Sequence, residues 1–260
     1  MSDYLSAGRD FLGPLGSGTG RFIRGDATAE AWDAAEPYRS RYGIDSLPTL
    51  DILICSVWAR HDQLVALLDH LAPQLEPFGG RARVLLNVDD ARAAVGAKRN
   101  QLMLAATARH TCFLDDDDRV SDTYIDRIME ALVDDPDYCG FRVKLTVDGY
   151  EQKPVIHSLT YPEWSEDEHG YYRGVSHLNP IRRTAALTGL PFQPGFGEDK
   201  AWADRVAASG LVKREVFIPE ALYHYQYSTS GSLFAGGPRH LGSVPELPEY
   251  AHVANIRPVI

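Results

Sequence analysis

The sequence has few cysteines and no long hydrophobic run. Cys55 and Cys112 stand in apolar stretches, so the three cysteines of the chain predict reduced core residues, neither a disulfide framework nor a zinc site. A membrane-spanning helix needs about 20 consecutive apolar residues, and no such run occurs. Residues 1–4 have no basic start leading into an apolar segment, so we predict no signal peptide, no membrane partner and a cytoplasmic location.

Positive charge is also scarce. The chain has 26 Lys and Arg against 36 Asp and Glu, a formal net charge of −10. This balance argues against a protein that coats nucleic acid generally, although it is compatible with a local basic groove. Glycine-rich residues 13–20 follow no predicted strand and lead into no helix, which favours a loop over a phosphate-binding turn.

From Leu50 onward, strand patterns alternate with helix patterns. We predict strands at 50–57, 84–88 and 111–114, and helices at 63–75, 95–108 and 121–133, with Ser121 as the N-cap of the last helix. Alternation at this spacing predicts βαβ units and a parallel sheet.

After residue 137 the pattern becomes mixed. Asp148-Gly149 predicts a hairpin turn, and further strands are predicted at 171–175, 215–218 and 222–227, with a helix at 199–209. We therefore predict an α/β fold with one catalytic domain at 48–228, divided into halves at 48–135 and 136–228. Residues 1–47 would form an N-terminal extension and residues 229–260 a tail or lid.

Four consecutive carboxylates, Asp115, Asp116, Asp117 and Asp118, follow the third predicted strand. Neighbouring carboxylates repel one another, and a hard divalent cation with oxygen ligands relieves that repulsion. In an extended chain, Asp115 and Asp117 point to the same side, at the end of a strand where open α/β sheets bind ligands. Two alternatives remain open: an Asp116–Asp118 register, and a solvated acidic turn.

Three more motifs accompany the acidic stretch: Asp89-Asp90 after the second strand, 96–100 in the second helix, and Gly197-Glu198-Asp199. In this order, across residues 48–227, the sequence resembles GT-A glycosyltransferases near glycosyltransferase family two. Residues 177–183 together with Tyr223-His224-Tyr225 resemble a virus- and phage-associated branch of that group. Residues 56–60 depart from the Pro-Thr-Tyr-Asn pattern that is usual after the first strand.

The resemblance implies a metal-dependent, inverting hexosyltransferase that uses a nucleotide-sugar donor, with UDP as the expected nucleotide. It assigns Mn²⁺ or Mg²⁺ to Asp117, Asp115 and His224, and imidazole suits Mn²⁺ better than Mg²⁺. Asp199, beside Glu198, is the expected general base. The expected donor-binding residues are Ser56, Arg60, Asp89, Lys98, Arg99, Asp115 and Asp116. The expected acceptor-side residues are Trp164, His177, Gly197 and Trp202.

The acceptor is the least determined part of the prediction. The phage-like resemblance makes a hydroxymethylated base in DNA a candidate, in the cytoplasm of a host cell. A glycan or a protein acceptor remains an alternative.

The same residues also have structural interpretations. Glu198 and Asp199 suit a helix start, Lys98 and Arg99 suit a solvated helix surface, and a histidine between tyrosines is commonly structural. A sugar nucleotidylyltransferase should carry a glycine-rich phosphate loop after its first strand, and residues 56–60 contain no glycine. A non-catalytic nucleotide-sugar-binding module is the other alternative; the joint presence of Asp117, Asp199 and His224 argues against it.

Overall fold

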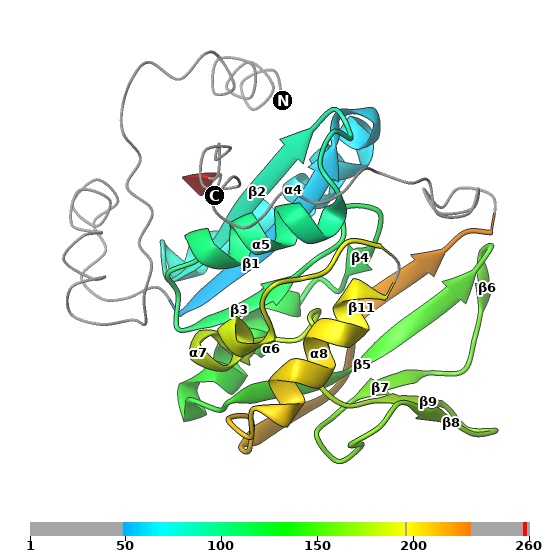
Figure 1. The fold of residues 1–260 in the computed structure, drawn as a ribbon. Coiled ribbons are helices and arrows are strands. Elements are labelled where there is room, and N and C mark those ends of the chain that lie inside the picture. Colours follow the sequence, from blue (N-terminus) through cyan, green and yellow to red (C-terminus); the bar gives the residue numbers. More distant parts are fainter. Residues whose placement is uncertain (1–48, 196, 230–256, 259–260) are drawn as a thin grey trace.

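The computed structural model describes residues 49–195, 197–229 and 257–258 (Figure 1). Its helices are α4 (His61–Leu75), α5 (Val95–Ala105), α6 (Tyr124–Ala131), α7 (Arg183–Ala186) and α8 (Glu198–Ala208), with 3-10 turns η1 (Trp58–Arg60), η2 (Glu76–Phe78), η3 (Leu132–Asp134) and η4 (Leu187–Gly189). Its strands are β1 (Leu50–Val57), β2 (Ala82–Asp89), β3 (His110–Phe113), β4 (Arg119–Val120), β5 (Tyr138–Val147), β6 (Tyr150–Glu151), β7 (Val155–His157), β8 (Ser165–Glu166), β9 (Tyr171–Arg173), β10 (Ile181–Arg182), β11 (Glu215–Tyr227) and β12 (Arg257–Pro258). The predicted extension at 1–47 lies outside the described residues.

Three parallel strands form the centre of the first half. β1 pairs with β2 on one side and with β3 on the other, so that Leu50 lies between Ala82 and His110. Most of β1 is buried, as expected of a parallel strand that is covered on both faces. The three predicted strands are therefore confirmed, and their carboxyl ends meet at one edge of the sheet.

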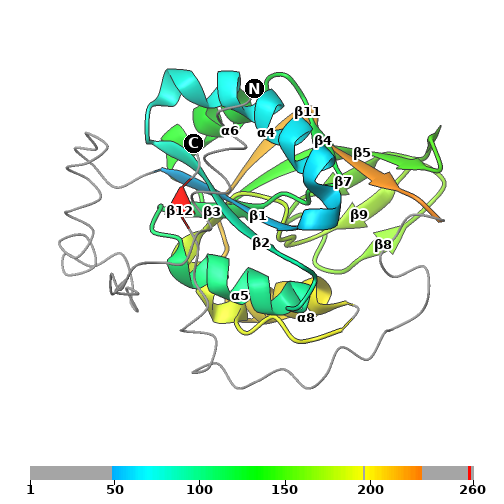
Figure 2. The same cartoon turned by 90° about the horizontal axis from the view of Figure 1, so that it is seen from above.

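Helices cover both faces of this sheet. On one face the side chains of α4 and α6 pack against Leu50, Ile52 and Ile54 of β1. On the other face α5, α7 and α8 pack against Leu53 and Leu85. Figure 2 shows the two layers, with α4 and α6 on one side of the strands and α5 and α8 on the other. The result is a three-layer α/β/α arrangement with two hydrophobic cores.

The second half of the sheet is mixed. β10 runs antiparallel between β3 and β5, while β11 runs parallel to β5 and antiparallel to β4. The predicted hairpin is present: Asp148 and Gly149 have φ of 49° and 84°, the left-handed pair that a tight β-turn requires. β12, in the segment predicted as tail or lid, pairs antiparallel with β2 at the edge of the sheet. Among the described helices, none combines the length and apolar character needed to cross a membrane.

Two predicted helix ends were wrong, each for a local reason. Ser121 is not the N-cap of α6, because its N–H and C=O bond to Leu222 of β11 and to Tyr124. α5 ends at Ala105, three residues earlier than predicted, because the N–H groups of Thr107 and Ala108 each donate to the buried Asp51 carboxylate at 2.8 Å.

Candidate active site

The four carboxylates lie between β3 and β4, where the carboxyl ends of the parallel strands meet. The N–H of Leu114 donates to Leu53 of β1 at 3.0 Å and continues the sheet by one residue. The chain then leaves the sheet as the acidic loop, which we define as residues 115–118. This is the edge at which open α/β sheets bind their ligands.

Alternate residues of the acidic loop face opposite ways. Asp116 and Asp118 are buried, whereas the side chains of Asp115 and Asp117 are 32% and 36% exposed. The chain is not extended here as the sequence prediction assumed, because it forms a turn in which the N–H of Asp118 donates to the carbonyl of Asp115 at 3.3 Å. Only Asp115 and Asp117 present carboxylate oxygens to the outside, and we call these two residues the open pair.

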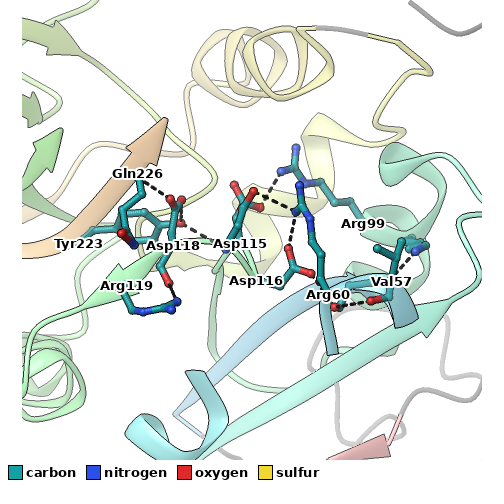
Figure 3. Close-up of polar contacts among 12 residues, drawn as sticks. Val57, Arg60, Arg99, Asp115, Asp116, Asp118, Arg119, Tyr223 and Gln226 are labelled. Atoms are coloured by element: carbon teal, nitrogen blue, oxygen red, sulfur yellow. Dashed lines mark hydrogen bonds and ion pairs between the residues drawn. The ribbon is translucent and has the colours of Figure 1, made fainter. Parts of the chain in front are cut away.

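The buried carboxylates are already hydrogen-bonded to the protein. Asp116 accepts from Ser56 Oγ at 2.6 Å and from Arg60 Nη1 at 2.7 Å. Asp118 accepts from Tyr223 Oη at 2.6 Å and from the N–H of Gln226 at 2.8 Å. Figure 3 shows Asp118 turned toward β11 and Asp116 turned toward Arg60. These bonds occupy the two buried carboxylates and leave the open pair for a ligand.

The Asp117 carboxylate is repelled by the neighbouring carboxylates. Burial raises its pKa above the usual value, Asp115 and Asp116 raise it further, and Arg60 opposes them. Arg60 Nη1 lies 3.0 Å from Asp117 Oδ2. A positive charge bound at Asp117 would relieve this repulsion.

The open pair fits a divalent cation that arrives together with a phosphate-containing ligand. Among the described residues, no three His, Cys, Asp or Glu side chains gather as a metal site. Mg²⁺ is commonly held by one or two carboxylates, substrate phosphates and water, and Mn²⁺ accepts the same oxygen ligands. Two exposed carboxylates are therefore a sufficient protein contribution.

The structure does not bring His224 to the acidic loop, contrary to the expected third ligand. His224 Nε2 lies 3.1 Å from Thr146 Oγ1 of β5. Its neighbours Tyr223 and Tyr225 face the acids instead. Tyr223 donates a hydrogen bond to Asp118, and the pKa of Tyr225 is raised first by burial and then by the loop carboxylates. Residues on a strand alternate between faces, so the two tyrosines and the histidine point opposite ways.

Arg99 joins the acidic loop to the start of α8. Its Nη2 donates to Asp115 at 3.1 Å and its Nη1 to Glu198 at 2.6 Å. The guanidinium is buried, with the Phe113 and Phe192 rings 5.6 and 5.8 Å away, and its Nε has no hydrogen-bond partner among the described residues. Arg99 is therefore neither a solvated helix residue nor a free phosphate ligand.

Lys98 and Asp89 satisfy each other. Lys98 Nζ is buried, forms an ion pair with Asp89 and donates to the backbone carbonyl of Ser56 at 2.7 Å. Asp89 also accepts the N–H groups of Ala91 and Ala93 at 3.0 and 2.7 Å. Although burial alone would raise the pKa of Asp89, Lys98 and these N–H groups lower it. The pair ties the ends of β1 and β2 together.

Glu198 and Asp199 open α8 in different environments. Gly197 precedes them with φ of 85°, a left-handed conformation that favours glycine. Glu198 is buried against Arg99, while the Asp199 side chain is 33% exposed. Burial would raise the pKa of Asp199, but His177, whose Nδ1 lies 3.8 Å away, and Arg99 lower it. Asp199 is thus an ionised carboxylate with access to the outside.

The expected acceptor-side residues separate into three groups. His177 is buried behind Asp199, and its Nε2 has no hydrogen-bond partner within the described part of the chain. Trp164 is exposed, with the Arg173 guanidinium 4.6 Å and Lys200 Nζ 5.5 Å from its ring, which places it beside α8. The assignment of Trp202 was wrong, because this side chain is fully buried and stacks on Phe192 at 5.2 Å.

Tyr223 is the residue that the sequence reasoning missed. Its hydroxyl donates to Asp118 and accepts from the N–H of Asp115 at 3.2 Å, so one side chain holds both ends of the acidic loop. The Tyr-His-Tyr alternation contained the signal, because two tyrosines on one face of a strand exclude the histidine between them from that face.

One family profile matches the middle of the chain. The profile of the family described as Glycosyl transferase family 2 matches residues 61–189, which include the acidic loop and His177 but end before Glu198. A comparison with curated proteins finds no match.

The chain is also similar to solved structures of S. aureus TarS. Residues 1–349 of TarS in complex with UDP-GlcNAc match with a TM-score of 0.51 and 12% identity, over 74% of this chain and 62% of that chain. A second structure of the same TarS residues gives a TM-score of 0.49 and 14% identity, over 68% and 60%. This chain therefore spans less than two thirds of the TarS chains it matches. The fold is α/β with a mixed central sheet, of the GT-A kind.

Proposed function

We propose that the chain is a glycosyltransferase that moves a sugar from a UDP-sugar to an acceptor hydroxyl with inversion of configuration, because residues 61–189 match the Glycosyl transferase family 2 profile. UDP is the proposed nucleotide because the TarS structure of the same fold was solved with UDP-GlcNAc. The proposed catalytic domain is residues 48–228, with donor binding mainly in 48–135 and acceptor binding mainly in 136–228.

One observation carries the proposal: a single guanidinium joins the open pair to the start of α8. Arg99 bonds Asp115 of the donor half and Glu198 of the acceptor half. Asp199, next to Glu198, therefore lies on the same side of the sheet edge as the open pair. A donor bound at the loop and a hydroxyl bound at Asp199 would meet in one place, as a displacement reaction requires.

On the donor side, Asp115 and Asp117 would hold Mn²⁺ or Mg²⁺ together with the diphosphate. The bound metal supplies a Lewis acid that stabilises the negative charge of the departing diphosphate. Asp116 stays buried and positions Arg60, whose Nη1 lies 3.0 Å from Asp117 of the open pair. Ser56, Lys98 and Asp89 support this edge through their mutual bonds, in place of the direct donor contacts expected from the sequence.

On the acceptor side, Asp199 is the proposed general base. Its lowered pKa keeps it ionised, so it can take the proton of the acceptor hydroxyl. The acceptor oxygen forms a bond to the anomeric carbon as the bond from that carbon to the diphosphate oxygen breaks. A single displacement of this kind inverts the anomeric configuration. His177 lies behind Asp199, with its Nδ1 3.8 Å from the carboxylate.

For the acceptor we propose a hydroxymethylated base in DNA. The exposed ring of Trp164, with Arg173 and Lys200 beside it, offers a stacking surface next to cations, which suits a base and its phosphates. UDP- and GDP-sugars should be screened against hydroxymethylated DNA, unmodified DNA and simple glycans, with products identified by mass spectrometry. Transfer to glycans alone would overturn the DNA acceptor and leave the enzyme assignment standing.

The mechanism is tested with Asp199→Asn, which keeps the shape of the side chain and removes the proton acceptor. We expect turnover to fall by about two to four orders of magnitude while UDP binding is retained. Asp122→Asn, at an exposed side chain before α6, is the matched control and should leave turnover unchanged. NMR of the product gives the anomeric configuration. A product that keeps the donor's configuration, or near-normal turnover in Asp199→Asn, would contradict the proposed base.

A further inference from the structure

Each carboxylate of the open pair already has an arginine partner. Asp115 is paired with Arg99 and Asp117 with Arg60, at 3.1 and 3.0 Å. Two arginines therefore neutralise part of the negative charge of the acidic loop before any ligand arrives. A divalent cation that binds the open pair meets one or both of these guanidinium groups.

The two arginines differ in how firmly they are held. Arg99 is buried between two aromatic rings and bonds a second carboxylate, Glu198. Arg60 leaves the short turn η1 at the rim of the site, and its side chain is 18% exposed. A partly exposed guanidinium changes partners at a lower cost than a buried one, because water can replace some of its bonds. Arg60 is thus the arginine that is able to move.

Arg60 also contacts one carboxylate of the open pair directly. One atom, Nη1, lies 2.7 Å from Asp116 and 3.0 Å from Asp117. Two positive groups on the same carboxylate repel each other. Asp116 does not depend on Arg60 alone, since Ser56 Oγ donates to its second oxygen at 2.6 Å. The loop can therefore keep its shape when Arg60 departs.

We propose that Arg60 is a built-in counter-ion of the acidic loop, which leaves Asp117 when metal and donor bind and pairs with the donor's diphosphate instead. This inference rests on the proposed function. A guanidinium forms paired, charge-assisted hydrogen bonds with phosphate oxygens, so the exchange replaces one ion pair with another. Arg60 then competes with the metal when the metal is alone and cooperates with it when the diphosphate is present.

Two binding measurements on Arg60→Gln test this exchange. Mn²⁺ alone is titrated and the free ion is followed by electron paramagnetic resonance; UDP is titrated calorimetrically at saturating Mn²⁺. We expect Arg60→Gln to bind Mn²⁺ alone about three- to tenfold more tightly and to bind UDP about tenfold or more weakly. Arg60→Lys, which keeps the charge but loses the fork of donors, should bind UDP with intermediate affinity.

The matched control is Arg119→Gln. Arg119 also borders the acidic loop, but its Nη1 donates to the backbone carbonyl of Asp118 at 2.8 Å. Arg119→Gln changes the net charge of the protein by the same amount as Arg60→Gln. Because Arg119 contacts a backbone carbonyl and not a loop carboxylate, the affinities of this variant for Mn²⁺ and for UDP should stay near those of the wild type.

The other outcomes overturn the inference in distinct ways. A fall in both affinities for Arg60→Gln would show that Arg60 only shapes the loop. Unchanged Mn²⁺ affinity with weaker UDP binding would make Arg60 a donor contact and no counter-ion. If wild type and variants all fail to bind Mn²⁺ while UDP binds in EDTA, the metal in the proposed function fails as well.

Discussion

At the acidic loop, four identical side chains have different properties because each faces a different partner. Asp116 and Asp118 are hydrogen-bonded in the interior, whereas Asp115 and Asp117 are partly exposed and paired with arginine. Burial raises the pKa of Asp118 well above its usual value, Asp115 adds to this, and the Tyr223 hydroxyl opposes it. The Tyr223 hydroxyl is therefore one of the buried groups that hold the loop, together with the N–H of Gln226.

Tyr223→Phe tests this role at the scale of a single atom. The change removes the donor to Asp118 and the acceptor of the Asp115 N–H, both in a buried place. We expect the free energy of unfolding to fall by about 1–3 kcal/mol, the usual cost of leaving a buried polar group unpaired. Urea unfolding measures it, with Tyr225→Phe on the same face of β11, at an exposed side chain, as control. Equal losses in the two variants would contradict the assigned role.

At the scale of elements, a pH-dependent contact joins strand β7 to the loop before β10. His157 of β7 is buried beside β5, and its Nδ1 lies 2.6 Å from the side-chain oxygen of Asn179. Burial lowers the pKa of His157 to about 4, although the bond to Asn179 opposes this. The folded protein therefore holds this imidazole neutral at pH values where an unfolded chain would protonate it.

This contact predicts the direction of an acid effect. Between the unfolded pKa, about 6.5, and the folded pKa, about 4, the unfolded state binds more protons. The contribution of His157 is fully present above that window and is lost as the pH falls through it, by at most about 1.4 kcal/mol per pH unit. Melting temperatures between pH 8 and 4.5 should fall less steeply for His157→Asn than for the wild type. The exposed control His169→Asn should keep the wild-type slope of melting temperature against pH. The same wild-type slope in His157→Asn would contradict the assigned role of His157.

Most helices and strands could be predicted from the sequence. The directions of their side chains could be predicted less reliably. Alternating strand and helix patterns predicted the parallel half, since hydrophobic periodicity reports which face each element buries. The period-two rule named Asp115 and Asp117 as a pair for an extended chain; they are the two exposed carboxylates, but the chain there is a turn. The same rule, applied to Tyr223-His224-Tyr225, would have excluded His224 from the loop. Trp202 was misplaced because a helical pattern shows that one face is buried but not which neighbour covers it.

At the scale of the whole molecule, the site is built by contacts between distant segments. Arg99 reaches Glu198 across 99 positions of the chain, and Tyr223 reaches Asp118 across 105. The sequence identified both acids from their motifs. It could not show the arginine or the tyrosine that holds each one, because partners so far apart are set by the packing of the sheet.

The central claim is that the open pair binds the donor's diphosphate with a metal. Calorimetric titration of UDP, with Mn²⁺ and with EDTA, tests it most directly on the wild type, Asp117→Asn and the exposed control Asp90→Asn. We predict that Mn²⁺ strengthens UDP binding about tenfold or more in the wild type and in Asp90→Asn, and that Asp117→Asn loses this gain. Equal UDP affinity in Mn²⁺ and EDTA for the wild type, or an undiminished gain in Asp117→Asn, would contradict the account.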